Sequence, residues 1–473
     1  MRRVIAAAVL VAAVAAVAAA VPWALGLYLE HRHGLLLDNL VTRGYRIPVD
    51  EYRVGWLRST MRTEIAPAEG EEQSRLRLNL RLRHGPEVWF GVQPPVVADA
   101  DGRARVLGGP REMPPLVLAA RLHGSGALDV ALRVPDIGYS GAAGRLSLVS
   151  SDADLRLARE GTWALDGHIE SLEATAPDGR RLRLDAIDCA LAGADADAPV
   201  PLSRLRLAVG ALHFDAAAAR RPVDVAAFEA SLTASATPPT TVAFTLGGSV
   251  AALSIGQDAY APSALAATIS GIDAAALRDL RVRLAALDRS GLSASQQGML
   301  TVRLLLTALP RLLSATPAAA LHRLSVTTPQ GPIAATADLR MAPTGKVAEP
   351  GMSLAVPQAE GAALLSVLWG RLFGSAQIEA PRSLVVALLA EQQTRRVRHE
   401  LALRGTPADT LPPALAADVE AAAQAATAAL LREGWLKSEQ GGLVATLAIE
   451  NGNLRVNGKA VALPDWLAAP VHP

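Results

Sequence analysis

The sequence predicts an α+β protein that is mainly antiparallel β: an N-terminal transmembrane helix, an elongated one-sided β-sheet body, C-terminal helices and a closing hairpin. Three observations predict it. An uncharged apolar stretch opens the chain, apolar and polar residues alternate through the middle, and helical spacing returns near the end. We therefore expect a membrane anchor at 1–29, a β-rich region at 30–350, and a helical segment with a terminal β-hairpin at 351–473.

The first element is the expected anchor. After Arg2 and Arg3, the chain runs from Val4 to Leu29 without a charged residue. About 20 apolar residues in a helix cross a bilayer core of roughly 30 Å. The two arginines favour a cytoplasmic N-terminus. This predicts a single-pass protein of the bacterial inner membrane with the bulk of the chain in the periplasm.

A cleaved signal peptide is the alternative, because Ala18, Ala19 and Ala20 fit a small-residue cleavage site. The apolar stretch continues past that site, however, and Trp23 and Tyr28 suit the membrane interface. These features favour a retained anchor. In either case the bulk of the chain is exported.

Composition limits the function classes. The chain has 473 residues, a net charge of +1 from 46 basic and 45 acidic residues, and only 4% aromatic residues. Nucleic-acid binding needs clustered basic charge and usually aromatic platforms, so no nucleic-acid partner is expected. Cys189 is the only cysteine, which excludes an intrachain disulfide, and we expect its thiol to be buried.

The middle of the chain carries a strand pattern. From Arg75 to Arg83, four leucines alternate with four arginines and an asparagine. Period two with one polar face is typical of antiparallel sheet solvated on one side. Shorter alternations recur as far as Met341. Turn signals that separate them include Asp101-Gly102, Asp166-Gly167, Pro177-Asp178-Gly179 and Thr328-Pro329-Gln330-Gly331.

Helices are expected at several places. Residues 30–44 extend the anchor as far as Gly44, and Asp273 caps a helix through Leu284. Residues 299–313 fit a helix or a strand. Past Pro350 we expect a helix at 360–373, a helix or buried strand at 384–389, alternation at 397–403, and a helix at 412–432 that Gly434 ends. A hairpin of strands 443–449 and 453–456 closes the chain.

No catalytic or metal-binding motif is present in the sequence. It contains neither a Gly-x-Ser-x-Gly motif nor a glycine-rich phosphate loop. His31 and His33 are the only close histidine pair; two residues apart on a helix they point to different faces, so we place them among lipid head groups rather than on a metal. The Asp-x-Asp pairs lack the further ligands of a calcium loop. We predict no cofactor, no metal and no enzymatic activity.

Two segments resemble the YdgA-like family of bacterial envelope proteins, a family without an established molecular function. The first includes Tyr52, Gly55-Trp56 and Ser59, and the second includes Gly434, Gly452 and Asn457-Gly458. The resemblance implies an inner-membrane-anchored periplasmic protein and brings no catalytic residues. From the residues alone, a glycine before a large aromatic suits a strand bend whose ring covers the start of the sheet.

These observations suggest a non-enzymatic protein that supports the cell envelope and binds lipid or another envelope protein. The leucine-bearing face decides between two forms of this hypothesis. If nothing covers it, the face suits acyl chains; if a second layer covers it, the protein is a structural module with a protein partner. The arginine face at 75–83 fits either a solvated surface or contact with acidic lipid.

Overall fold

The computed structural model describes most of the chain between residues 22 and 461. The described ranges are 22, 24–31, 33–38, 40–42, 44–67, 75–84, 96–107, 114–141, 144–194, 198, 200–215, 221–237, 240–260, 262–288, 293–342, 369–403, 411–439, 441–450 and 452–461. The chain forms two compact units, residues 1–196 with 207–220, and residues 197–206 with 221–473. The predicted boundaries at 29/30 and 350/351 rest on composition and stay predictions.

Unit 1 begins with a helix. The described residues from 22 to 42 are helical, and the helix ends at Gly44, which has a φ of +85° and donates its N–H to the Val41 carbonyl at 3.0 Å. This confirms the predicted helix at 30–44. Most of the predicted anchor, residues 1–21 and 23, lies outside the described residues.

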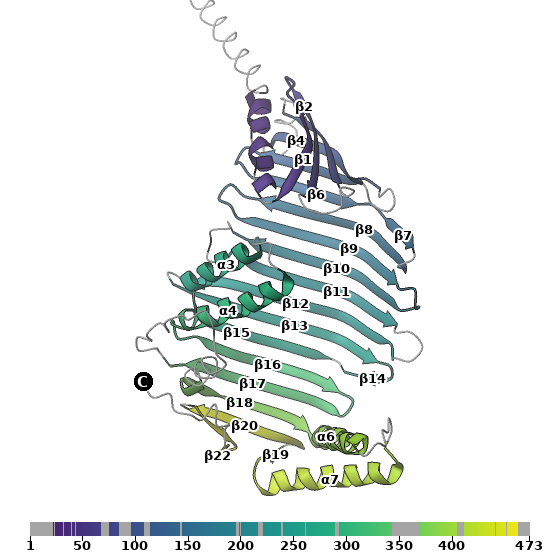
Figure 1. The fold of residues 1–473 in the computed structure, drawn as a ribbon, viewed down its shortest axis with the longest axis vertical. Helices are drawn as coiled ribbons and strands as arrows, with labels where there is room; N and C mark the ends of the chain where they lie inside the picture. The colour runs from purple at the N-terminus through teal and green to yellow at the C-terminus, as the bar shows by residue number, and fades with distance from the viewer. Residues whose placement is uncertain are drawn as a thin grey trace, which may run out of the picture. The chain divides into compact units, whose positions relative to one another are not determined.

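The rest of unit 1 is an antiparallel meander (Figure 1). Its strands are β1 (Tyr45–Arg53), β2 (Arg58–Pro67), β3 (Arg75–Arg83), β4 (Val96–Leu107), β5 (Leu116–His123), β6 (Leu128–Val134), β7 (Ile137–Gly141), β8 (Gly144–Leu157), β9 (Trp163–Thr175) and β10 (Arg181–Gly193). Each strand pairs with the next, except that β6 and β7 pair with the two ends of β8. The predicted antiparallel β character is confirmed.

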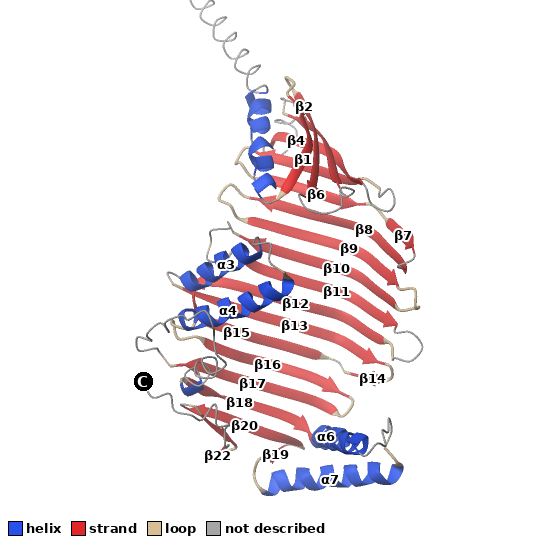
Figure 2. Ribbon diagram, viewed as in Figure 1, coloured by secondary structure: helices blue, strands red, loops and turns tan. Residues whose placement is uncertain are grey.

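Unit 2 is a second meander, with helices inserted between its strands (Figure 2). Its strands are β12 (Val223–Thr237), β13 (Thr241–Ile255), β14 (Asp258–Ala259), β15 (Ser263–Asp273), β16 (Ala318–Thr328), β17 (Gly331–Met341), β18 (Leu372–Pro381), β19 (Lys437–Glu439), β20 (Gly442–Glu450), β21 (Asn453–Val456) and β22 (Lys459–Ala460). The strand β11 (Leu202–Asp215) spans the division between the units.

The helices of unit 2 follow capping signals. In α3 (Ala274–Asp288) the carboxylate of Asp273 accepts the Ala276 N–H at 2.7 Å, as the sequence predicts. The ambiguous stretch forms α4 (Ala294–Leu312), and a capping box of Ser293 and Gln296 explains why helix prevails there. The remaining helices are α6 (Arg382–Leu403) and α7 (Pro413–Arg432), which pack against each other.

Three local predictions are wrong. Asp101-Gly102 and Asp166-Gly167 lie inside β4 and β9 rather than in turns. At Gly102 a neighbouring strand comes close, since a Cβ there would lie 2.2 Å from the Asn79 carbonyl oxygen, whereas a Cβ on Gly167 would meet nothing nearer than 3.8 Å. Leu372 and Phe373, placed in a helix by their spacing, begin β18. The alternation at 397–403 belongs to α6.

Candidate functional site

The N-terminal sequence motif lies beneath the N-terminal helix. Gly26 of that helix packs so closely on the sheet that a Cβ there would lie 2.9 Å from Val54 and 3.1 Å from the His84 ring. Under this contact the Ser59 hydroxyl and His84 Nε2 form a hydrogen bond of 2.9 Å. Both side chains are fully buried, at 1% and 0% exposure. The helix therefore docks over a buried polar pair, and Met61 on the same face of β2 is buried with it.

A second polar group joins the helix to β1 and β2. His33 Nε2 lies 2.9 Å from the Asp50 carboxylate and 3.2 Å from the Thr63 hydroxyl, which donates to the same carboxylate at 3.2 Å. The His33 and Tyr52 rings are 5.7 Å apart. The prediction that His33 lies among lipid head groups is wrong, because its ring is held by these partners at the sheet; His31 is exposed.

Burial shifts the ionisation of this polar cluster. It lowers the pKa of His84, and the backbone carbonyls of Pro22 and His84 only partly offset that shift. It raises the pKa of Tyr52, against a smaller opposite effect of Ser59. His84 Nδ1 and the Tyr52 hydroxyl are buried and complete no hydrogen bond among the described residues. Both side chains are therefore held in their neutral forms.

A serine and a histidine at hydrogen-bond distance are also the first two parts of a nucleophilic site. Here, however, no carboxylate orients His84 Nδ1 among the described residues, and neither side chain reaches solvent. A substrate has no access to the Ser59 oxygen in this arrangement. The pair therefore suits positioning of the helix on the sheet better than catalysis.

Next to this polar cluster, the strand register of unit 1 aligns apolar side chains into rows on one face. One row runs Leu80, Gly102, Leu118, Leu132, Ala153, Gly167 and Cys189, and the next runs Leu82, Ala100, Ala120, Val130, Leu155, Leu165 and Leu191. At a strand spacing of about 4.8 Å, seven strands carry these rows over roughly 30 Å. Ser59 and Thr63 lie on this same face, opposite Leu82 and Leu78, so the N-terminal helix covers its first strands.

The remainder of this apolar face is only half-buried. Among the described residues, no apolar side chain of β5, β6, β8, β9 or β10 is fully buried, and Leu146 and Leu157 are 41% and 36% exposed. The predicted burial of Cys189 is wrong for the same reason, since its row is partly open. A second protein layer would bury such residues, so the part of unit 1 that the structure describes provides no such cover.

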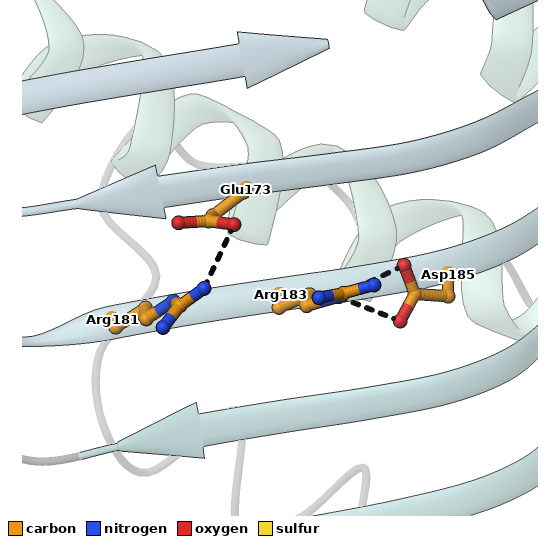
Figure 3. A network of polar contacts seen from close by, with 4 residues as sticks. All are labelled: Glu173, Arg181, Arg183 and Asp185. Carbon is orange, nitrogen blue, oxygen red and sulfur yellow. Dashed lines mark hydrogen bonds and ion pairs between the residues drawn. The ribbon is translucent and has the colours of Figure 1, made fainter. Parts of the chain in front are cut away.

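The opposite face of the same strands is charged. Figure 3 shows Arg181 on Glu173 at 3.0 Å and Arg183 on Asp185 at 2.9 Å. His168 lies 2.7 Å from Asp188, and this hydrogen bond raises the pKa of His168. The alternation predicted for residues 75–83 therefore continues through unit 1 as one apolar face and one ionic face.

Unit 2 repeats the pattern with partial cover. A row runs Leu232, Leu246, Ala267, Leu321, Ala337, Ala376 and Leu447. Leu246 and Ile378 on this face are 42% and 44% exposed. Val242, beside the start of α3, is fully buried.

The C-terminal motif forms turns. Asn457 and Gly458 have φ of +49° and +84°, as a tight β-hairpin turn requires. The Asn457 amide donates to the Trp435 carbonyl and accepts the Thr446 N–H, each at 2.9 Å. Gly434 ends α7 with a φ of +73°, and the Gly452 carbonyl accepts from Trp369 Nε1 at 2.7 Å. These four residues therefore fix backbone geometry.

The N-terminal motif residues have different surroundings. Tyr52 and Ser59 belong to the buried polar cluster, and Gly55 makes a tight bend in which a Cβ would lie 2.1 Å from the Arg58 carbonyl oxygen. Trp56 is 58% exposed, so its ring does not cover the sheet as expected. His84 carries no signal in the sequence, because it lies 25 residues after Ser59 and has no motif around it.

Comparison with known proteins shows the family. Residues 1–464 match a family described as a bacterial protein of unknown function, DUF945. The chain belongs to this family. This confirms the predicted membership of a bacterial family without known function, whereas the YdgA-like name stays a prediction. No curated protein and no solved structure matches the chain.

Among the described residues, one helix, α7, is long and apolar enough to cross a membrane by length and composition alone. Its Val419, Ala423 and Thr427 are buried. No group of three or more His, Cys, Asp or Glu side chains is placed to hold a metal ion within the described ranges.

Proposed function

We propose that this chain is a non-enzymatic protein of the bacterial cell envelope that binds lipid acyl chains on the apolar face of unit 1. Its N-terminal segment would anchor it in the inner membrane, with the bulk in the periplasm. The observation that carries the proposal is the half-buried aliphatic face on β5, β6, β8, β9 and β10, beyond the strands that the N-terminal helix covers, where no second layer lies among the described residues. Leucine, valine and alanine match acyl chains, which offer no polar group to satisfy.

The position of the helix supports this function. The helix that follows the predicted anchor docks on the same face that carries the leucine rows, at Ser59 and Thr63. An acyl chain at the membrane surface would therefore meet this face where it continues beyond the helix. The ionic opposite face of the sheet keeps that side in water.

Site-specific photocrosslinking in living cells tests the proposal. A benzoylphenylalanine placed at Leu165, on the apolar face of β9, should capture lipid that mass spectrometry identifies. The same probe at the adjacent Asp166, which faces the ionic side, is the matched control. Lipid adducts at both positions, or at neither, would contradict the proposal. A reporter enzyme that works only outside the cytosol, fused to the C-terminus, tests the location separately.

The alternative function is a structural module that binds another envelope protein. One observation favours it: Met299, Val302 and Leu305 form an exposed stripe along α4, at 67%, 57% and 44% exposure. Such a stripe suits a partner helix or groove. A photocrosslinker at Val302 that captures one defined protein, while the probe at Leu165 captures no lipid, would establish this alternative instead.

A further inference from the structure

The ionic face of unit 1 changes character between its first and last strands. Two cross-strand rows that include β2, β3 and β4 hold four arginines and two glutamates. In the first row Glu64 faces Arg77, which faces Arg105; in the second, Glu51 faces Arg62, and Asn79 separates Arg62 from Arg103. We call Arg62, Arg77, Arg103 and Arg105 the basic patch.

Both glutamates of these rows are already engaged. The Glu64 side chain is 5% exposed and accepts from Arg77 Nε at 2.8 Å, with Arg62 at 3.9 Å. Glu51 lies 3.8 Å from Arg53. The carboxylates near the basic patch therefore neutralise its β2–β3 side and leave the β4 side positive.

Arg103 and Arg105 form no ion pair among the described residues, and both are exposed. The nearest acid on their strand, Asp101, faces Arg81 across the ladder. Arg77 and Arg105 lie directly opposite each other, and like charges at such positions destabilise a sheet; Glu64 offsets this on the Arg77 side alone.

The last strands of the same face show the contrast. There Arg181 and Arg183 each reach a carboxylate, on Glu173 and Asp185 at 3.0 and 2.9 Å (Figure 3). In the turn before β10, Arg180 lies 2.6 Å from Asp178. Arg121 and Arg133 of the same face have no ion pair among the described residues either, but each faces an aspartate on a neighbouring strand, Asp129 and Asp152. Arg103 and Arg105 differ from them, because they face no acidic residue across the ladder.

We propose that the basic patch binds the phosphate headgroups of anionic phospholipid at a membrane surface. Guanidinium groups form paired hydrogen bonds to phosphate oxygens, and adjacent strands place two of them within reach of one phosphate. The patch lies on β2, β3 and β4, which follow the N-terminal helix and β1 in the sequence. It is on the face opposite the leucine rows, so it is a different site from the one proposed for acyl chains, and its membrane setting rests on that proposed function.

Native mass spectrometry of the full chain in mild detergent tests this proposal. The protein is titrated with phosphatidylglycerol, which carries a net negative charge, or with phosphatidylcholine, which is neutral overall. At about fivefold per arginine near a lipid surface, we expect phosphatidylglycerol to bind at least tenfold more tightly. The variant Arg62→Gln/Arg103→Gln/Arg105→Gln should lose this preference.

The variant Arg180→Gln/Arg181→Gln/Arg183→Gln removes the same charge from the β9–β10 end of unit 1 and should keep the preference. Loss of preference in both variants, or none in the unmodified protein, would overturn the proposal, and so would displacement of the lipid by millimolar inorganic phosphate. Phosphatidylcholine adducts report acyl binding separately. If those persist while the headgroup preference is absent, only the basic patch fails; if they are absent while the preference holds, only acyl binding fails.

Discussion

The two sequence motifs that suggested a family do different physical work. At the C-terminal end, Asn457 and Gly434 adopt positive φ, and the two hydrogen bonds of the Asn457 side chain hold a backbone turn. At the N-terminal end, Ser59 and His84 are buried side chains beneath the helix, and His84 Nδ1 and the Tyr52 hydroxyl complete no hydrogen bond among the described residues.

The C-terminal motif sets the course of the backbone, whereas the N-terminal motif depends on hydrogen bonding between buried side chains. A turn motif depends on which residues tolerate a left-handed backbone, so its substitution should cost a modest and local amount. A buried polar pair depends on both partners at once, because an orphaned buried group bears its full desolvation cost. The largest single-residue effects should therefore fall in unit 1, under the helix.

The substitution His84→Leu should have the largest effect. It leaves the buried Ser59 hydroxyl without its partner and changes the surface on which Gly26 packs, which together cost about 3 kcal/mol. Hydrogen exchange of the β1–β3 amides in the full chain measures this loss. The double variant Ser59→Ala/His84→Leu should recover part of it, because no orphaned hydroxyl remains; an equal or greater loss would show that the pair is not coupled.

The substitution Asn457→Ala should rank second. It removes two hydrogen bonds and a residue that tolerates a φ of +49°, at a cost of about 2 kcal/mol. Faster exchange of the β20–β22 amides is the readout. Asn453→Ala on the same hairpin, where the side chain is exposed, is the control and should change little. Similar effects for both asparagines would remove the special role of Asn457.

The substitution Gly434→Ala should cost less, about 1 kcal/mol, because only the left-handed helix end is strained. Gly298→Ala inside α4 should have the opposite sign, since a Cβ there meets nothing within 4 Å and alanine favours the helix by about 0.5–1 kcal/mol. Thermal unfolding of the two variants, measured side by side, checks both signs.

Much of the fold follows from the sequence. The alternation at Arg75–Arg83 predicts β3, the cap at Asp273 predicts α3, and Gly434 predicts the end of α7. The prediction of a turn at Asp101-Gly102 fails for a physical reason. Gly102 looks like a turn residue in sequence, but its role depends on the approach of Asn79 from another strand, which sequence pattern does not encode.

The candidate site was predictable only in part. Tyr52 and Ser59 stood in the family motif, yet their partner His84 is distant in sequence and carries no local signal. The alternation predicted an apolar face, but not whether it is covered, because cover depends on where the helices of the chain are placed. Register also decides that Arg77 faces Arg105 while Arg181 reaches Glu173.

The smallest expected effect concerns pH. Burial lowers the pKa of His84 below its ordinary value of 6.5, so the unfolded chain binds the proton that the folded chain excludes. The protection of β1–β3 should therefore be complete above pH 6.5 and decline as the pH falls below it. His168 has a raised pKa, and its effect on stability has the opposite sign: the stability that it contributes is lost as the pH rises, and solvent screening weakens it.

Hydrogen exchange between pH 5 and 7.5, corrected for intrinsic rates, should show the acid decline in β1–β3. His84→Gln should abolish the pH dependence while His168→Asn leaves it intact, because only His84 is buried beneath the helix.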